Sequence, residues 1–245
     1  MKQTIAAAAL AMATWAPAVV AQVDNAQRVE VVGDLDAEWA SYRYAWTAST
    51  FFEKYTRTRP LIQAHMQLRP IKPEMPVSGL QVRIVGKTTD VRLDADMIGR
   101  VTLPMSRKIY DEDAVLRLNR KKGLYYFSGR YSVRERDDGV YDAASLREAC
   151  EQLISAQRES GYRLRLLGKK CAGVKFVYAS TTDASPVAFR AAGDRDTPVP
   201  LSEGHPFEDN SMGIYKLAIL RFADWPRDGR LVTTEHPLAI GTLYE

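Results

Sequence analysis

The stretch Leu80-Gln81-Val82-Arg83-Ile84 alternates apolar and polar residues and decides the expected fold of this chain. A period of two places one set of side chains on a buried face and the other set in water, as in a strand that covers a core. The alternation returns at 91–93 and at 101–103, with a polar turn at 94–99 between them. Short alternating segments at roughly ten-residue spacing predict an antiparallel β-sandwich.

More strands are expected on either side of this stretch. Residues 114–118 predict a strand, and residues 124–127 its hairpin partner across the loop at 119–123. Residues 67–76 contain three prolines and predict an extended connector. The side chains expected to face the core are Leu80, Val82, Ile84, Val101, Leu103, Leu116 and Leu118.

An aromatic helix is expected ahead of the sandwich. After a short strand at 28–32, Asp36 is a suitable N-cap for a helix that continues to about Tyr55. Its aromatic residues at helical spacing are Trp39, Tyr42, Trp46, Phe52 and Tyr55. Such a face either packs on the domain or stacks on sugars or bases. The candidate contact surface consists of Trp39, Tyr42, Trp46 and Trp225.

A second helix is expected from about Tyr141, with Ser145 and Glu148 as a capping box and Gly161 as its end. Strands at 162–166 and 174–178 should follow, since apolar residues there alternate with Arg163, Arg165, Lys175 and Val177. Residues 183–213 lack periodicity and predict a long loop. The remaining expected elements are a strand at 214–222, a turn at 225–229, a strand at 231–233 that pairs back, and a last strand at 238–244.

Cys150 and Cys171 are the chain's two cysteines. In an oxidising compartment they allow one intramolecular disulfide, which would fix the second helix to the start of a strand. Buried free thiols and a reactive thiol are the alternatives. The sequence has no CxxC pattern and no histidine near either cysteine, which favours the structural disulfide.

These elements predict an α+β, β-dominated fold: an antiparallel β-sandwich with an N-terminal helix and a second helix packed on it through a disulfide-linked strand. The expected organisation is a signal peptide at 1–21, an N-terminal strand and amphipathic helix at 22–59, the β-sandwich at 60–140, a helix and strands with the disulfide at 141–182, a long loop at 183–213 and C-terminal strands at 214–245.

The first 21 residues have the pattern of a secretory signal peptide. Lys2 precedes an apolar run, Pro17 ends it, and Val19-Val20-Ala21 places small residues at the expected cleavage site. We therefore expect a periplasmic or secreted protein cleaved after Ala21. The formal net charge of +4 comes from well-mixed charges, which argues against nucleic acid as a partner. No later apolar run is long enough for a transmembrane helix.

No catalytic, cofactor-binding or metal-ligating residue is assigned from the sequence. His65, His205 and His236 are scattered and are expected on the surface or in loops. Asp94, Asp96 and Gly99 predict an ordinary polar turn, since no closing bidentate Glu follows. GxSxG, SxxK, GxGxxG and P-loop motifs are absent from the sequence. Short basic clusters, such as the one at 120–122, are expected to be solvated, with contact to an anionic envelope polymer as the alternative.

Three segments carry a resemblance to a known class of module. They are Gly79-Leu80-Gln81-Val82-Arg83-Ile84, Leu93-Asp94-Ala95-Asp96 and Gly99-Arg100-Val101-Thr102-Leu103-Pro104. In this order they resemble the carboxypeptidase-regulatory-like, or transthyretin-like, β-sandwich, from which the inserted Met97-Ile98 departs slightly. The wider arrangement is similar to an uncharacterised family of exported proteobacterial proteins. The resemblance implies a β-sandwich of a class that is usually non-catalytic and serves in packing, adhesion or ligand contact.

Three functional hypotheses remain open. The first is an exported non-catalytic binding or envelope-accessory protein whose partner is a protein or an envelope component. The second is an envelope hydrolase acting on glycan or peptide, which requires a carboxylate pair in a cleft or a Ser–His pair. The third is a structural subunit of a surface assembly, for which an unpaired sheet edge is the clue.

Overall fold

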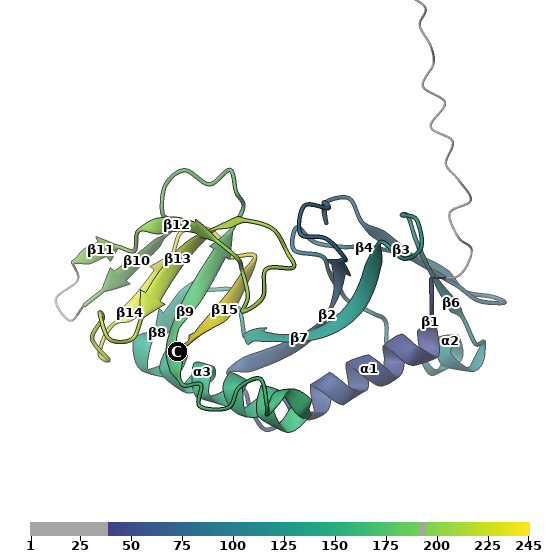
Figure 1. Ribbon diagram of the computed structural model, residues 1–245, viewed down its shortest axis with the longest axis horizontal. Helices are drawn as coiled ribbons and strands as arrows, with labels where there is room; N and C mark the ends of the chain where they lie inside the picture. The colour runs from purple at the N-terminus through teal and green to yellow at the C-terminus, as the bar shows by residue number, and fades with distance from the viewer. Residues whose placement is uncertain (1–38, 192–194) are drawn as a thin grey trace, which may run out of the picture. The chain divides into compact units, whose positions relative to one another are not determined.

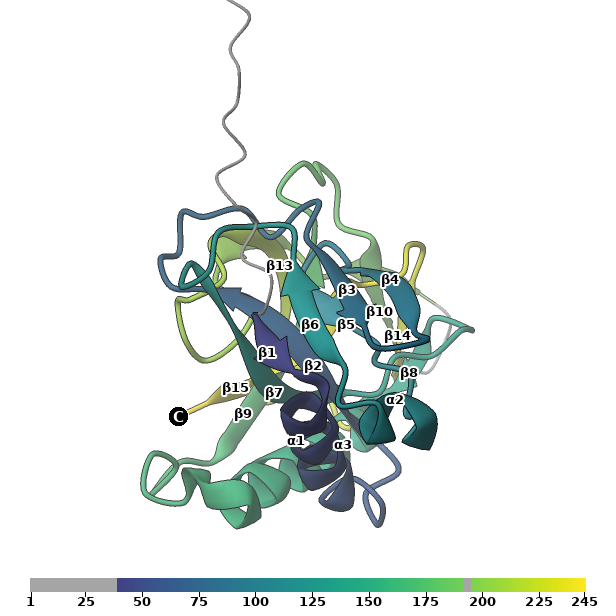
Figure 2. The ribbon, with the colours of Figure 1, turned by 90° about the vertical axis from the view of Figure 1, so that its right-hand side faces the viewer.

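The computed structural model describes residues 39–191 and 195–245, which belong to one compact unit, Gly33–Glu245 (Figures 1 and 2). The signal peptide, the strand at 28–32 and the N-cap Asp36 lie outside the described residues. All strand pairs within the described part are antiparallel and belong to four sheets. The β-dominated α+β fold is therefore confirmed.

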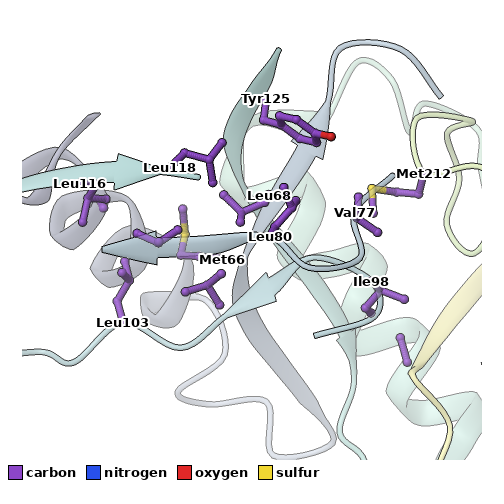
Figure 3. Packing of buried hydrophobic residues seen from close by; sticks show 14 of the residues in the cluster. Met66, Leu68, Val77, Leu80, Ile98, Leu103, Leu116, Leu118, Tyr125 and Met212 are labelled. Carbon is purple, nitrogen blue, oxygen red and sulfur yellow. The ribbon is translucent and has the colours of Figure 1, made fainter. Parts of the chain in front are cut away.

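Two sheets enclose the first core. One has the order β1-β6-β3-β4, and the other has the order β5-β2-β7. Their strands are β1 (Ala40–Ser41), β2 (Ile62–Pro70), β3 (Gln81–Val85), β4 (Asp90–Asp94), β5 (Arg100–Val101), β6 (Val115–Leu118) and β7 (Tyr125–Val133). Side chains from both sheets meet in one apolar cluster (Figure 3).

The alternation that predicts this sandwich gives the correct register. Val82 and Ile84 are fully buried, whereas Arg83 between them is exposed and pairs with Asp90 on β4. All seven side chains expected to face the core are buried: Leu80, Val82, Ile84, Val101, Leu103, Leu116 and Leu118. At about 25 cal/mol per Å² of apolar area, burial of this kind is the main favourable contribution to folding.

Two helices accompany the first sandwich. Helix α1 (Tyr42–Lys54) contacts β2 and β7, and the short helix α2 (Arg107–Asp111) lies beside α1. The Ser41 hydroxyl accepts a 3.2 Å hydrogen bond from the Arg43 N–H and caps α1. The expected start near Asp36 is wrong, because Ala40–Ser41 forms β1 and pairs with β6 before the helix begins.

A second pair of sheets encloses the second core. Their orders are β11-β10-β14-β8 and β12-β13-β9-β15. The strands are β8 (Val140–Asp142), β9 (Cys171–Tyr178), β10 (Val187–Arg190), β11 (Asp196–Pro198), β12 (Leu201–Gly204), β13 (Tyr215–Arg221), β14 (Arg230–Thr233) and β15 (Ala239–Tyr244). Helix α3 (Ala143–Gln157) and the π-helical turn η1 (Arg158–Tyr162) connect β8 to β9, and α3 packs on β9.

Several expected pairings in the first sandwich are wrong. Residues 125–127 do not pair with β6, because they begin the long strand β7, whose partner is β2. The expected connector at 67–76 is strand as far as Pro70, which lies at the end of β2, where a missing N–H is tolerated. Strand β6 pairs with β3 and β1 instead.

The second half departs further from expectation. The strand expected at 162–166 is wrong, because Tyr162 ends η1 and residues 163–166 form turns, with the backbone N–H of Leu166 bonded to the Tyr162 carbonyl. Residues 183–213 contain β10, β11 and β12, and 231–233 pairs with β8 and β10. Helix α3 begins at Ala143, which places Ser145 inside the helix and removes the capping box. The helical region continues past the expected end at Gly161 to Tyr162, although the backbone breaks at Gly161, whose φ of 107° is accessible to glycine.

Candidate functional site

The candidate contact residues contribute mainly to packing. Tyr42 is fully buried, so its assignment to a contact surface is wrong. Trp46 is partly buried against Tyr110, with ring centroids 5.6 Å apart. Trp39 donates from its indole N–H to the Tyr125 carbonyl at 3.1 Å and packs on the first core.

Trp225 is also partly buried and lies far along the chain from the other three. Its ring centroid is 5.0 Å from that of Phe189, and its carbonyl accepts a hydrogen bond from Arg147. Strand β10, which carries Phe189, lies in the second sheet pair, whereas Trp39 packs on the first core. The four aromatic residues therefore do not form one surface.

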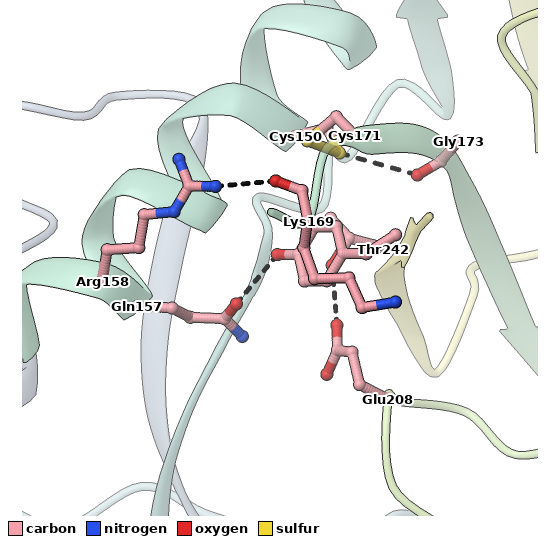
Figure 4. Close-up of a disulfide and its surroundings, with 9 residues drawn as sticks. Cys150, Gln157, Arg158, Lys169, Cys171, Gly173, Glu208 and Thr242 are labelled. Atoms are coloured by element: carbon pink, nitrogen blue, oxygen red, sulfur yellow. Dashed lines mark hydrogen bonds between the residues drawn. A yellow bond between two sulfur atoms is a disulfide. The ribbon is translucent and has the colours of Figure 1, made fainter. Parts of the chain in front are cut away.

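The predicted disulfide is present. Cys150 on α3 and Cys171 at the start of β9 are bonded, with their Cα atoms 5.9 Å apart (Figure 4). Cys150 is fully buried, as expected for the inner face of the helix. The bond fixes the middle of α3 to the first residue of β9, an inner strand of its sheet.

The three histidines remain apart. His236 is exposed, and His205 lies in a loop with Nδ1 2.9 Å from the Gly213 carbonyl. The expectation that His65 lies on the surface or in a loop is wrong, because it lies in β2 and both ring nitrogens are buried. Burial lowers its pKa well below the ordinary value, and the positive charges of Arg100 and Arg130 add to the shift.

Two adjoining pockets contain Arg130 and Lys175, which are the buried charged residues among those described. We call the two pockets the cationic cleft, defined by Arg69, Arg130, Arg165, Lys169, Lys175, Glu208 and Asp209. These residues come from β2, β7, the segment after η1, β9 and the segment between β12 and β13. Both pockets share Arg165 and Glu208, so they form one continuous site.

Asp209 binds both arginines on the strand pair. Arg130 donates from Nη2 to its Oδ2 at 3.1 Å, and Arg69 Nη2 lies 2.9 Å from its Oδ1. The Ser211 N–H also donates to Oδ1. Burial by itself would raise the pKa of Asp209, but Arg130, the Ser211 hydroxyl and Arg69 together hold it well below the usual range.

Arg130 is a buried cation of the cleft, at 8% exposure. Its Nε donates to Gln67 Oε1 at 2.8 Å, and Gln67 in turn donates to the Ile98 carbonyl. The guanidinium lies 4.0 Å from the ring centroid of Phe207, which supplies a cation–π contact. Every strong interaction of Arg130 therefore comes from within the protein.

Lys175 occupies the neighbouring pocket and is 7% exposed. The strand alternation placed it on the outer face, but Nζ donates to the carbonyls of His205 and Phe207, at 3.2 and 2.9 Å. Burial lowers the pKa of Lys175. Nearby, the Thr242 hydroxyl donates to Glu208 at 2.7 Å (Figure 4).

Arg165 and Lys169 differ from the other cations of the cleft. Both are exposed, and their side chains have no hydrogen bond or ion pair within residues 39–191 and 195–245. Five cations of the cleft therefore face two carboxylates, and the two unpaired cations stand at its rim. A concave site with excess positive charge attracts anions.

The carboxylates of the cleft are suited to hydrogen-bond acceptance. A general acid requires a raised pKa near the working pH. The pKa of Asp209 is shifted in the opposite direction, and Glu208 is held by Thr242. Both carboxylates are therefore engaged within the protein, Asp209 by Arg69 and Arg130 and Glu208 by Thr242.

A second polar pocket lies around Arg100, where it collects Asp94, Asp96, Glu135 and His65. Arg100 donates to Asp96 at 2.5 Å and to Glu135 at 2.6 Å. Asp96 also accepts from the N–H groups of Ile98 and Arg100 and so stabilises the turn. Among the described residues, no group of three or more His, Cys, Asp or Glu side chains is placed to hold a metal ion.

Comparison with known proteins adds no relative, because no family model, no curated protein and no solved structure matches the chain. Within the part of the chain that the structure describes, none of the helices combines the length and apolarity needed to cross a bilayer. The residues of the cationic cleft therefore carry the functional argument.

Proposed function

We propose that the chain is an exported, non-catalytic binding protein that holds an anionic group of an envelope component in the cationic cleft. The observation that carries the proposal is the pair of unpartnered cations of the cationic cleft: Arg165 lines both of its pockets, and Lys169 lines the one that holds Lys175. The ion pairs of Asp209 with Arg69 and Arg130 hold the side chains inside the cleft in place. The unpaired cations are free to meet a carboxylate or a phosphate.

Calorimetry against short acidic peptides and sugar phosphates tests this proposal. Arg165→Gln should weaken the binding of a responding probe by about tenfold, the usual effect of losing one charge-assisted contact. Arg163→Gln is the matched control, because Arg163 is exposed on the same segment and lines neither pocket. No binding by any probe, or equal losses in the two variants, would contradict the proposal.

Export is part of the proposal and is tested separately. Protein recovered from a periplasmic or secreted fraction should have an intact mass that begins at Gln22. A mass that includes residues 1–21 would contradict export. The disulfide supports this placement, since structural disulfides persist mainly in oxidising compartments.

The resemblance of residues 79–104 to carboxypeptidase-regulatory-like modules belongs to the same proposal. It is supported by β3, β4 and β5, which lie in two antiparallel sheets around one core. Modules of that class are usually non-catalytic, which agrees with a binding role. Fold alone does not fix function, so the cleft carries the argument.

The pocket around Arg100 is the place where the hydrolase alternative would have its carboxylates. Asp96 and Glu135 both accept hydrogen bonds from Arg100, so each carboxylate already has a partner within the protein. Loss of turnover on peptidoglycan in Glu135→Gln, with the fold intact, would favour the hydrolase.

The alternative of a structural subunit in a surface assembly would use an unpaired sheet edge. The edge strand β4 carries the charged residues Asp90, Arg92 and Asp94, and charges at an edge oppose the addition of a strand from another chain.

A further inference from the structure

The segment between η1 and β9 exposes leucines beside unpaired cations. We call residues 162–170 the cationic loop; its sequence is Tyr162-Arg163-Leu164-Arg165-Leu166-Leu167-Gly168-Lys169-Lys170. It contains four cations and no acidic residue. Leu164 is 89% exposed and Leu167 is 78% exposed, more than any other large hydrophobic side chain that the structure describes.

The backbone of the cationic loop is held in place. Leu166 is buried, and its carbonyl accepts from the Lys169 N–H at 3.1 Å. Arg158 donates to the Lys169 carbonyl at 2.7 Å (Figure 4). Lys170 and Glu245 exchange two backbone hydrogen bonds, and the disulfide follows at the next residue. The two leucines are thus presented by a fixed loop.

The four cations add a second, independent feature. The side chains of Arg163, Arg165, Lys169 and Lys170 are exposed and make no hydrogen bond or ion pair with any residue that the structure describes. Apolar side chains flanked by unpaired basic residues are typical of segments that lie at a lipid surface. There the leucines enter the boundary of headgroups and acyl chains, and the cations meet lipid phosphates.

We propose that the cationic loop docks the protein on an anionic lipid surface by inserting Leu164 and Leu167. Charge complementarity favours this occupant, since the loop has four positive charges and no negative one. A soluble anionic polymer would engage the cations but would leave both leucines in water. A lipid surface satisfies both features at once.

This docking surface goes beyond the proposed function and does not depend on it. Leu164, Leu167, Arg163 and Lys170 line neither pocket of the cationic cleft, so the two activities are separable by substitution. Docking would place the cleft near the membrane, because Arg165 and Lys169 belong to both the loop and the cleft.

Co-sedimentation with vesicles tests the proposal. The probes are phosphatidylcholine vesicles and mixed vesicles of phosphatidylcholine and phosphatidylglycerol in equal parts. The disulfide-bonded chain should bind the mixed vesicles and not the neutral ones. L164S/L167S should lower the partition coefficient by at least about tenfold, and R163Q/K170Q should lower it by a similar factor.

Two matched variants control for general apolarity and charge. Ile214→Ser removes an exposed apolar side chain elsewhere, and K121Q/K122Q removes two exposed cations from another loop. Both should bind vesicles as the unmodified chain does. Circular dichroism should show that every variant keeps its β-rich spectrum.

The outcomes separate this proposal from the cleft. Vesicle binding that fails in L164S/L167S, with retained affinity for a soluble acidic probe, supports docking. Absence of vesicle binding overturns docking and leaves the cleft proposal standing. Binding that depends on the cations but not on the leucines also overturns it and indicates a soluble anionic polymer as the partner.

Discussion

Arg130 and Asp209 are 79 positions apart in the sequence, and Nη2 of the arginine donates to Oδ2 of the aspartate at 3.1 Å. Arg130 is 8% exposed and the Asp209 side chain 19%, so the pair lies largely out of water. The contact ties β7 of the first sandwich to the segment before β13 of the second sheet pair. Removal of one partner leaves a buried charge without compensation.

Asp209→Asn should therefore destabilise the protein by about 3–5 kcal/mol near neutral pH. The pKa of Asp209 is lower in the folded chain than in the unfolded one, so its contribution is full above the unfolded value of about 3.9. That contribution is lost as the pH falls through the folded value. Urea unfolding at a series of pH values should show the difference between the two proteins shrinking below about pH 4.

The exposed Asp224 provides the control for this experiment. Asp224→Asn should change the free energy of unfolding very little at any pH in the series. A cost of Asp209→Asn that stays constant down to the acid end would show that the ion pair is not the origin of the effect.

Gly129 on β7 permits the close approach of α1. A Cβ at this position would lie 1.9 Å from Cε2 of Phe52, which also packs edge-on against Tyr131. Gly129→Ala must displace the Phe52 ring and should cost about 1–3 kcal/mol, as overpacked substitutions do. Denaturant unfolding measures this cost.

A double-mutant cycle identifies its origin. In a Phe52→Ala background the three atoms nearest to the added methyl group are removed, so Gly129→Ala should then cost much less. A coupling energy of about 0.5–3 kcal/mol is expected for residues in contact. Additive effects would mean that the helix does not pack on β7 through this ring.

Val82 and Arg83 test the register of the first sandwich. Val82 is fully buried, so Val82→Ala should cost about 1–3 kcal/mol from lost burial and a residual cavity. Arg83 is exposed and pairs only at the surface with Asp90, so Arg83→Ala should have a much smaller effect. Equal losses in chemical denaturation would show that the faces of β3 are assigned incorrectly.

The sequence predicts β3 well because its two faces have different surroundings. One face meets the first core and the other meets water, so polarity alternates along the strand. The alternation of polarity does not predict burial on β9, which lies between β13 and β15 in its sheet. There Lys175 occupies a position that alternation assigns to water, yet it is buried by bonds to two carbonyl groups.

The cationic cleft could not be predicted because its members come from five separate parts of the chain. Arg69 and Arg130 are brought together by the pairing of β2 with β7. The sequence does not predict this pairing, because it predicts that the start of β7 forms a short hairpin with β6. Asp209 lies in a region that lacks periodicity. The local signal in the sequence is the acidic pair Glu208 and Asp209, near serine and histidine in an otherwise irregular segment. The partners of these two residues are set by long-range contacts.

The disulfide carries the last prediction. Cys150 and Cys171 are 21 positions apart, and a loop of about this length is worth roughly 3 kcal/mol in the chain-entropy account. The double variant Cys150→Ser/Cys171→Ser should lose about 2–4 kcal/mol in urea unfolding. Hydrogen exchange should accelerate in the cationic loop, because the disulfide holds Cys171, the residue that directly follows the loop. The amides of β3 should be unaffected at low denaturant.

The unmodified chain under a strong reductant is the control and should match the variant in both measurements. Unchanged exchange in the loop would mean that the Lys170–Glu245 backbone pair alone is enough to hold it.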